Sequence, residues 1–316
     1  MSLDVLAPIS LPHFDTIFPF LRRAFAPDTS LNDNENRFDV QLAASHINPT
    51  RPINVLDVGC GDWLILKNLL QSHTDHFEGN CSYVGIDWLN DKHEFDKLAK
   101  KCCRRCFPKL ENLHFDLTQN EGLEAAICTR GPFDVVVLMN VFHELPSERN
   151  IELFELLFSN LAEAGSLIII DPDWSWCISE EAWKPRAGQH LSGLRSEWES
   201  NAVWLSKDGI EDVLQSMGFN VAVKVVPRTM HLWSAVASIP TEVRRANAMA
   251  ARTALRGRLE TQLLEERRRI EELRYDLRSS FQKDPALTGD LLVKTMKFFA
   301  ACVSQCKRLE TIETLR

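Results

Sequence analysis

The amino-acid sequence predicts an α/β fold: a doubly wound, mostly parallel seven-stranded sheet with helices on both faces, followed by a C-terminal helical extension. Three observations lead to this prediction. An apolar strand runs directly into a glycine-rich turn and a helix within residues 54–70. Strand-like and helix-like segments then alternate up to residue 173, which is typical of βαβ units and a parallel sheet. Two more strand-like segments follow before residue 240, where the composition of the chain changes.

The glycine-rich turn is the most informative local feature. Residues 54–63 read Asn-Val-Leu-Asp-Val-Gly-Cys-Gly-Asp-Trp, so Asp57 ends an apolar run just before Gly59-Cys60-Gly61. Glycine allows unusual φ angles and a close approach of ligand to main chain, and a helix start offers unpaired N–H groups. A dinucleotide turn has a third glycine, where this chain has Leu64. The turn therefore indicates a ligand other than a tightly held pyrophosphate.

Later strands are predicted in a regular order, and polar residues stand at their ends. Residues 83–87 form the second strand, whose terminal Asp87 can accept both hydroxyls of a ribose. Residues 114–118 mark the end of the third strand. Residues 133–145 contain the fourth strand and the start of a loop. The remaining elements are a fifth strand within 161–173, a helix within 205–218 that ends near Gly218, and two closing strands at 221–226 and 232–238.

The D-x-G-x-G turn and this order of segments resemble the class I S-adenosylmethionine-dependent methyltransferases. The resemblance covers roughly residues 40 to 240. It implies S-adenosylmethionine as the cofactor, O- or N-methylation of a small molecule, and an adenine contact at Asp116. The cofactor-binding residues that we expect from it are Asp57, Gly59, Cys60, Gly61, Asp87, Trp88, Asp116, Leu117 and Asn140.

Two residues after the fourth strand are the catalytic candidates, His143 and Glu144. The pKa of histidine lies near neutral pH, so His143 is suited to deprotonate a hydroxyl or an amine. The alternative is that His143 packs at a junction between loop and helix while Glu144 is solvated. Residues 140–143 read Asn-Val-Phe-His rather than Asn-Pro-Pro-Tyr, which disfavours exocyclic amines of bases and glutamine side chains as acceptors. His190 and His231 are weaker candidates.

We divide the chain into an N-terminal helical cap (1–50), a methyltransferase domain (51–240) and a C-terminal two-helix arm (241–316). Residues 14–25 form an amphipathic segment of the cap, and 28–37 a polar loop. Within the domain, residues 174–204 carry five of the eight tryptophans and are expected to form an insertion that covers the substrate. The alternative is that these rings only pack the insertion itself.

The arm is predicted as a helix over 241–282 and a second helix over 290–314, paired as an antiparallel hairpin. The first helix has an apolar stripe of coiled-coil type, but the stripe is short, and Glu266 interrupts it. One interpretation is that the arm binds a second copy of the chain or another protein, because the stripe must be buried. The other is that the arm packs on the domain as a helical cap.

Composition limits the class of partner. The net charge is −8, which disfavours nucleic acid, although the 16 Lys/Arg and 11 Asp/Glu of residues 241–316 make the arm basic. No apolar run is long enough to span a membrane, and the N-terminus lacks the basic flank of a secretory signal. Nine scattered cysteines fit reduced thiols, so we expect a cytoplasmic protein.

The cluster of Cys102, Cys103 and Cys106 lacks a matching second half, so we expect no metal site. The main alternative to a small-molecule enzyme is a cofactor-binding regulatory or scaffold protein, or a protein methyltransferase, whose arm recruits a partner.

Overall fold

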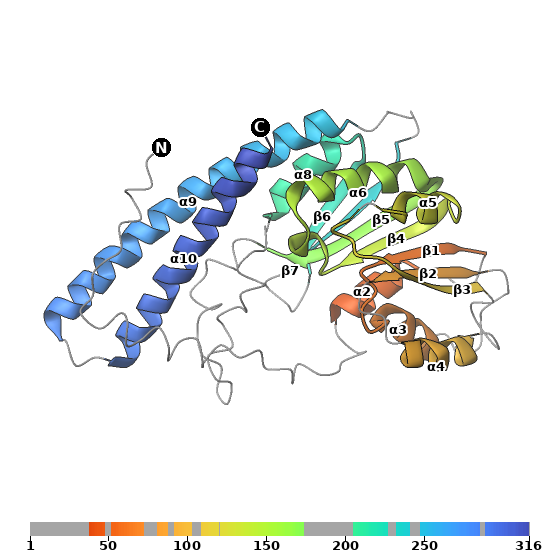
Figure 1. Ribbon diagram of the computed structural model, residues 1–316, viewed down its shortest axis with the longest axis horizontal. Coiled ribbons are helices and arrows are strands. Elements are labelled where there is room, and N and C mark those ends of the chain that lie inside the picture. The colour runs from red at the N-terminus through yellow and green to blue at the C-terminus, as the bar shows by residue number, and fades with distance from the viewer. Residues whose placement is uncertain are drawn as a thin grey trace.

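The computed structural model describes residues 38–47, 52–72, 81–87, 92–102, 109–119, 121–173, 205–226, 232–240, 247–284 and 288–315. Its centre is a seven-stranded sheet of order β3-β2-β1-β4-β5-β7-β6 (Figure 1), in which β7 alone runs antiparallel to its neighbours. The strands are β1 (Asn54–Val58), β2 (Ser82–Asp87), β3 (Lys109–His114), β4 (Phe133–Met139), β5 (Leu161–Pro172), β6 (Asn220–Val225) and β7 (Leu232–Ser238). This confirms the predicted fold class.

Helices cover both faces of the sheet because the central strands are apolar on both sides. Val55 of β1 packs with α2 (Phe38–Ser45), α3 (Leu64–Ser72) and α4 (Lys92–Cys102), whereas the next residue, Leu56, packs with the opposite layer. That layer consists of α5 (Leu123–Cys128), α6 (Ser147–Asn160) and α8 (Lys207–Ser216). The helices that follow β1 and β2 lie in the first layer, whereas the helix that follows β4 lies in the second. The neighbouring strands β1 and β4 therefore form a topological switch point, and ligands of open parallel sheets bind beside such a point.

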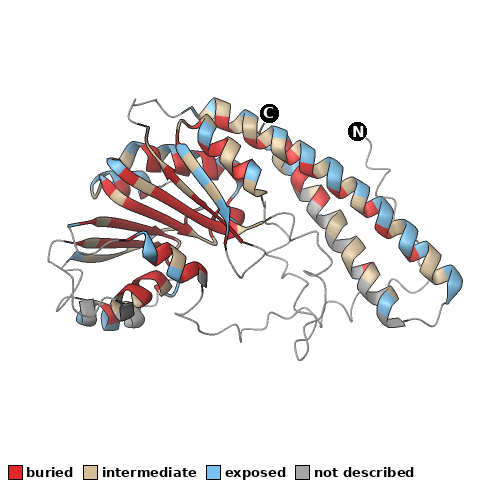
Figure 2. Ribbon diagram, turned by 180° about the vertical axis from the view of Figure 1, so that it is seen from behind, coloured by how far each residue is buried: buried red, intermediate tan, exposed pale blue. Residues whose placement is uncertain are grey.

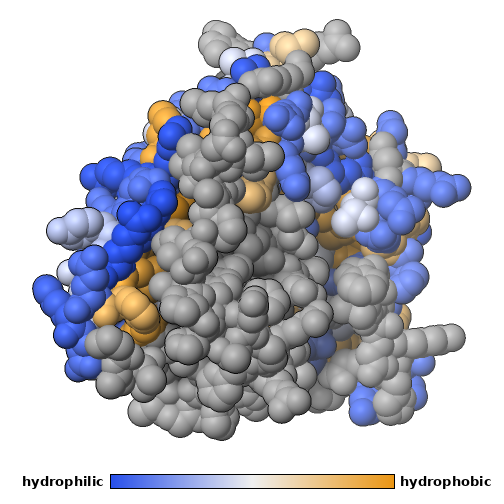
Figure 3. Space-filling view, turned by 60° about the vertical axis from the view of Figure 1, so that its left-hand side comes forward, coloured by the Kyte–Doolittle hydropathy of each residue, from blue (hydrophilic) through white to orange (hydrophobic). Residues whose placement is uncertain are grey.

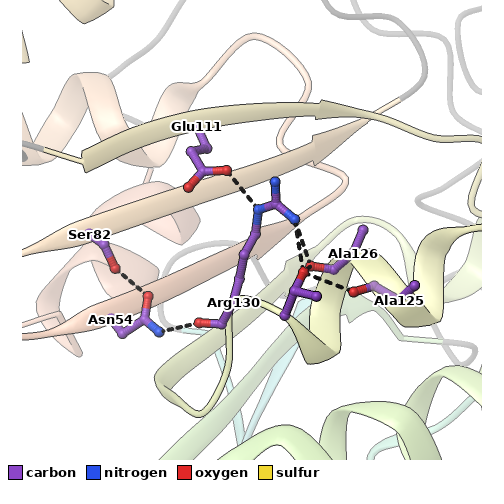
Figure 4. A network of polar contacts seen from close by, with 7 residues as sticks. Asn54, Ser82, Glu111, Ala125, Ala126 and Arg130 are labelled. Carbon is purple, nitrogen blue, oxygen red and sulfur yellow. Dashed lines mark hydrogen bonds and ion pairs between the residues drawn. The ribbon is translucent and has the colours of Figure 1, made fainter.

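Polar contacts join the starts of the first four strands (Figure 4). The side-chain amide of Asn54 donates hydrogen bonds to the carbonyls of Arg130 and Pro132, and its main-chain N–H donates to Asp134. Ser82 bonds to the Asn54 side chain, and Nε of Arg130 donates to Glu111 at 2.6 Å. This network holds the end of the sheet opposite the glycine turn, so the carboxyl ends of the strands are left to form a site.

The C-terminal arm consists of α9 (Ala248–Lys283) and α10 (Thr288–Thr314), which lie side by side in both ribbon views (Figures 1 and 2). The first turns of α9 pack against α8 and α6, and Ala251, Leu255 and Leu259 belong to the hydrophobic core of the domain. Ile312 and Leu315, at the end of the chain, join the same core. The rest of the helix pair extends beyond the sheet. The arm is therefore anchored to the domain at one end.

Glu266, the residue that interrupts the apolar stripe, has a partner inside the arm. Its Oε1 lies 3.0 Å from Nη2 of Arg308, and both side chains are almost fully buried. Arg308 also donates from Nη1 to Gln262 at 3.0 Å. The stripe is thus covered by α10 and by the domain. Burial of the apolar stripe therefore does not require a partner. Association through the arm stays a prediction.

With the arm's side of the molecule turned forward, the described surface is mostly hydrophilic (Figure 3). Among the described helices, none combines the length and the apolar character needed to cross a lipid bilayer. Several predicted features lie outside the described residues: the segments 14–25 and 28–37, the tryptophan-rich insertion 174–204, His190 and His231.

Candidate active site

The glycine turn is tied to the end of β2. The main-chain N–H groups of Gly59 and Cys60 both donate to the carbonyl of Ile86, at 2.8 and 3.2 Å. The N–H of Gly61 donates to Oδ2 of Asp87 at 2.8 Å. Three of the predicted cofactor residues, Gly59, Gly61 and Asp87, are therefore brought together at the carboxyl edge of the sheet.

The two glycines of the turn are needed for different reasons. Gly59 has φ +72°, and a Cβ there would lie 2.2 Å from Cγ2 of Val141, so the turn is packed tightly against the loop after β4. Gly61 has φ +45°, and a Cβ there would have no atom within 4 Å. Of these two glycines, Gly61 is therefore the one whose main chain is open to an approaching ligand.

Trp63 faces the core and not this opening. It is buried, and its ring lies 5.3 Å from that of Phe95 and 6.4 Å from that of Tyr83, measured between centroids. A Cβ on Gly85 would lie 2.3 Å from the Trp63 ring. The bulky ring of Trp63, which precedes Leu64, therefore fills a space left by a glycine of β2.

Asp57 and Cys60 are buried beneath the turn. Burial raises the pKa of Asp57 to about 7; the hydroxyl of Tyr83, which donates to Oδ2 at 2.6 Å, opposes this shift, and the charge of Asp87 adds to it. Burial also raises the pKa of the Cys60 thiol far above its usual range, with the charges of Asp57 and Asp87 contributing. The thiol therefore stays protonated and is unsuited to nucleophilic chemistry.

The loop after β3 is shaped by its own carboxylate. Oδ1 of the exposed Asp116 accepts hydrogen bonds from the main-chain N–H and the hydroxyl of Thr118, at 2.9 and 2.7 Å, and Oδ2 accepts one from Gln119. The bonds from Thr118 are the main cause that lowers the pKa of Asp116. Leu117, the next predicted residue, is buried.

Asn140 and His143 lie where β4 ends, in a loop that leads into α6. Asn140 has φ +58°, and its N–H donates to the carbonyl of Ile170 at 2.8 Å. His143 is buried within the short helix η2 (Phe142–Glu144). Its main-chain N–H donates to Oδ2 of Asp171 at 3.0 Å, and its Nδ1 lies 3.1 Å from each oxygen of that carboxylate.

Asp171 is the residue that sequence reasoning missed. A carboxylate beside Nδ1 holds the proton on that nitrogen and leaves Nε2 as the basic one. Glu144, the other catalytic candidate, lies 3.9 Å from Nε2 and is about one third exposed. A usable signal was present in the sequence, because Asp171 ends a strand predicted to follow β4, and adjacent parallel strands end at the same edge of a sheet.

The first turn of α6 fixes both loops of this edge. The Asn150 amide donates to the carbonyls of Phe142 and Leu145, at 2.9 and 3.3 Å, and so holds the turn that carries His143. Arg149 donates to carbonyls of the loop after β3. Sequence reasoning did not select either residue, because polar residues at a helix start are usually solvated or cap the helix.

A few predicted residues cannot be placed in this site. Trp88, Cys103 and Cys106 lie outside the described residues, as does the side chain of Cys102. The cysteine cluster therefore stays untested.

A family model for a methyltransferase domain matches residues 30–223. No curated protein matches the chain. Solved structures that resemble it include the mitomycin 7-O-methyltransferase MmcR, with a TM-score of 0.44 and 14% identity over 64% of this chain and 53% of that chain. Another is magnesium protoporphyrin IX methyltransferase from Synechocystis PCC 6803, with a TM-score of 0.42 and 18% identity over 72% and 96%. A third is 1,6-didemethyltoxoflavin-N1-methyltransferase from Burkholderia thailandensis, with a TM-score of 0.46 and 15% identity over 74% and 93%.

This chain spans only about half the length of MmcR. The assignment therefore rests on the family model, whose match covers more than half of the chain and includes the glycine turn and strands β1 to β5. The chain belongs to the methyltransferase domain family.

Proposed function

We propose that this enzyme methylates an oxygen or a nitrogen of a small molecule, and that His143 accepts the proton which the acceptor loses. The observation that carries the proposal is the buried pair of His143 and Asp171 at the carboxyl edge of the sheet, with Nδ1 and the carboxylate 3.1 Å apart. This edge also holds the glycine turn, so a base and a cofactor site lie at the same end of the strands.

The residues at this edge fit S-adenosylmethionine. Above Gly61 the main chain is open, and Asp87 stands beside it at the end of β2. In the proposed site Asp87 binds the ribose hydroxyls, while Asp116 and Leu117 meet the adenine. Asn140 and Trp88 complete the site, and the buried Asp57, Gly59 and Cys60 act by shaping the turn. When bound, the cofactor supplies an electrophilic methyl group on a sulfonium sulfur.

The chemistry of the protein side is alignment and removal of one proton. Asp171 orients the imidazole so that Nε2 takes the proton, and the buried carboxylate then stabilises the charged ring. A base of this kind is useful for hydroxyl and amine acceptors, which must lose a proton when they are methylated. This requirement supports O- or N-methylation, with Glu144 assisting at the exposed side of His143.

A small-molecule acceptor is proposed together with a cover formed by the tryptophan-rich insertion. We do not propose partner binding as a second function, because the described part of the arm buries its apolar stripe within the chain.

Calorimetric titration with S-adenosylmethionine and S-adenosylhomocysteine tests the cofactor site. We expect micromolar binding by the wild-type chain and a loss of about 100-fold or more in Asp87→Ala, because a ribose in the site loses its charged acceptor. Asp96→Ala, which removes an exposed carboxylate from α4, is the matched control and should bind as the wild type does. Wild-type affinity in Asp87→Ala would contradict the site.

A screen of hydroxyl- and amine-bearing compounds with a labelled methyl donor tests the reaction. Transfer by the wild-type chain that falls by about 100-fold or more in His143→Ala, with cofactor affinity retained, is the expected result. Equal transfer by both chains would remove His143 from the mechanism and leave the methyltransferase assignment intact.

A further inference from the structure

Arg149, in the first turn of α6, is a charged residue whose side chain is buried. Only 6% of it is exposed. Its Nε donates to the carbonyl of Leu117 at 2.8 Å, its Nη2 donates to the carbonyl of Gln119 at 3.1 Å, and its Nη1 pairs with Glu152 at 2.8 Å. Burying a guanidinium is costly unless its donors are satisfied, so these contacts are a substantial constraint on the loop.

The loop that Arg149 contacts is also tied to the sheet and to the core: the N–H of Phe115 donates to the carbonyl of Asp87 at 3.2 Å, and Leu117 is buried. Its residues lie between β3 and α5 without regular secondary structure. From within the loop, the carboxylate of Asp116 binds Thr118 and Gln119. From α6, Arg149 fixes the two carbonyls on either side of Thr118. Arg149 therefore ties the part of the loop that follows Asp116 to α6, a helix more than 30 residues later in the chain.

We propose that Arg149 is a positioning residue for recognition of the adenine ring. The inference rests on the proposed function, which places the adenine amino group at Asp116 and Leu117. Arg149 holds this segment where it can distinguish a 6-amino purine from a 6-oxo purine. Arginine suits the task because its planar fork donates in several fixed directions at once, which a lysine ammonium on a flexible stem does not reproduce.

The same helical turn connects this loop to the catalytic turn. Asn150, the next residue, holds the turn that carries His143, and Glu148, the preceding one, pairs with Arg252 of α9 at 2.9 Å. Residues 148–150 thus fix the arm, the adenine loop and the catalytic turn to one another. Within this group only Arg149 touches the adenine loop, so its removal should affect recognition of the base specifically.

A purely structural role for Arg149 predicts a different result from a positioning role. If Arg149 only stabilised the fold, its loss would weaken all nucleoside ligands equally. If it positions the adenine loop, the loss falls on ligands that carry the 6-amino group. S-adenosylhomocysteine and S-inosylhomocysteine differ at that position of the purine, so the ratio of their dissociation constants separates the two roles.

The experiment is a calorimetric titration of both ligands into the wild-type chain, Arg149→Met, Arg149→Lys and Arg130→Met. Arg130→Met is the control, because Arg130 also bonds to a main-chain carbonyl but lies at the opposite end of the strands. We expect Arg149→Met to bind S-adenosylhomocysteine about tenfold more weakly, a loss of the size of one hydrogen bond, and S-inosylhomocysteine almost as before. Arg149→Lys should be intermediate, and Arg130→Met should keep the wild-type ratio.

Thermal unfolding of each variant shows that it is folded at the temperature of the titration, and Arg149→Lys carries the test if Arg149→Met does not fold. An unchanged ratio in a folded Arg149 variant, whether both affinities stay or both fall, would overturn the inference, and so would equal binding of the two ligands by the wild-type chain. If the wild-type chain binds neither ligand, the proposed cofactor site itself fails and the inference fails with it.

Discussion

His143 and the carboxylate of Asp171 are joined twice, once through the imidazole and once through the main chain. Nδ1 lies 3.1 Å from both carboxylate oxygens, and the main-chain N–H of His143 donates to one of them at 3.0 Å. Asp171 is only 1% exposed. One buried carboxylate therefore fixes both the position of the turn that carries His143 and the orientation of its ring.

Replacing Asp171 by Asn should separate these two roles. The amide oxygen can still accept the main-chain N–H, but the amide NH₂ can donate to Nδ1, which moves the imidazole proton to Nε2 and removes the basic lone pair. We expect kcat to fall by about 100- to 1,000-fold with little change in the affinity for S-adenosylhomocysteine. Steady-state kinetics with an acceptor found by screening, together with calorimetry, measures both quantities.

Nitrogen NMR of the imidazole gives a readout that does not depend on the acceptor. The wild-type ring should carry its neutral-state proton on Nδ1, and the Asp171→Asn ring on Nε2. Glu144→Gln is the control, since Glu144 lies 3.9 Å from Nε2 and should leave the tautomer unchanged. The same tautomer in wild type and Asp171→Asn would contradict the orienting role.

Alanine at Gly59 should mainly reduce stability, whereas alanine at Gly61 should mainly reduce ligand binding. Gly59→Ala combines a left-handed φ with a collision against Val141, so we expect a loss of about 2–5 kcal/mol in the free energy of unfolding. Gly61→Ala meets no neighbouring atom and should cost about 1–2 kcal/mol for its φ alone. Its methyl group, however, would stand where the cofactor approaches the main chain.

Urea unfolding and titration with S-adenosylhomocysteine distinguish the two glycine variants. Val141→Ala in the Gly59→Ala background should recover part of the lost stability, because it removes the colliding Cγ2. Our interpretation of the open turn would be wrong if Gly61→Ala bound the ligand as tightly as the wild type.

Stability should depend on pH through Asp57. Burial raises the pKa of this carboxyl from its ordinary value of 3.8 to about 7 in the folded chain. Between these values the folded state holds a proton that the unfolded state has released. The stabilisation is therefore complete below about pH 4 and is lost as pH rises to about 7, by at most about 1.4 kcal/mol per pH unit.

Asp57→Asn isolates this contribution, because the amide does not titrate and can still accept the hydrogen bond from Tyr83. We expect the wild type to lose stability relative to Asp57→Asn as pH is raised from 4 to 7 in urea unfolding measurements. A difference between the two chains that does not change with pH would show that Asp57 ionises normally.

Removing one partner of the Glu266–Arg308 ion pair should lower the free energy of unfolding strongly, whereas replacing both partners by apolar residues should lower it little. Glu266→Leu leaves the buried Arg308 guanidinium without its carboxylate, and we expect a loss of about 3–5 kcal/mol in the free energy of unfolding. The double variant Glu266→Leu/Arg308→Leu should recover most of it. As a control, Arg268→Ala removes the exposed pair with Glu272 and should cost less than about 0.5 kcal/mol. Equal losses in the single and double variants would contradict this account.

Much of the fold could be predicted because its signals are local. The apolar run before Gly59, the acid at the end of β2 and the alternation up to residue 173 are each read from neighbouring residues, and they gave the sheet, the turn and the position of His143. The two helices of the arm followed from periodicity in the same way. The second was predicted over 290–314 and is α10 (Thr288–Thr314), whereas the first was predicted over 241–282 and α9 begins later, at Ala248, and ends at Lys283.

The apolar stripe of α9 is a feature whose burial could not be predicted from neighbouring residues. Its periodicity predicted a helix with one apolar face, but not whether the domain, the second helix or another chain would cover that face. The structure places Leu255 and Leu259 against the domain, and it pairs Glu266 with Arg308, 42 positions later in the chain. An interruption of the pattern became a specific contact because α10 returns along α9.

The sequence by itself determined the family, the glycine turn and the strand ends that carry Asp87 and His143. Only the tertiary structure decided that Asp171 contacts His143, that Arg149 holds the loop after β3, and that Gly59 serves packing while Gly61 faces open space. The physical reason is that periodicity and turn chemistry act over a few residues. A buried polar side chain, by contrast, must find its partner across the strand order and helix contacts of the whole fold, which no local pattern encodes.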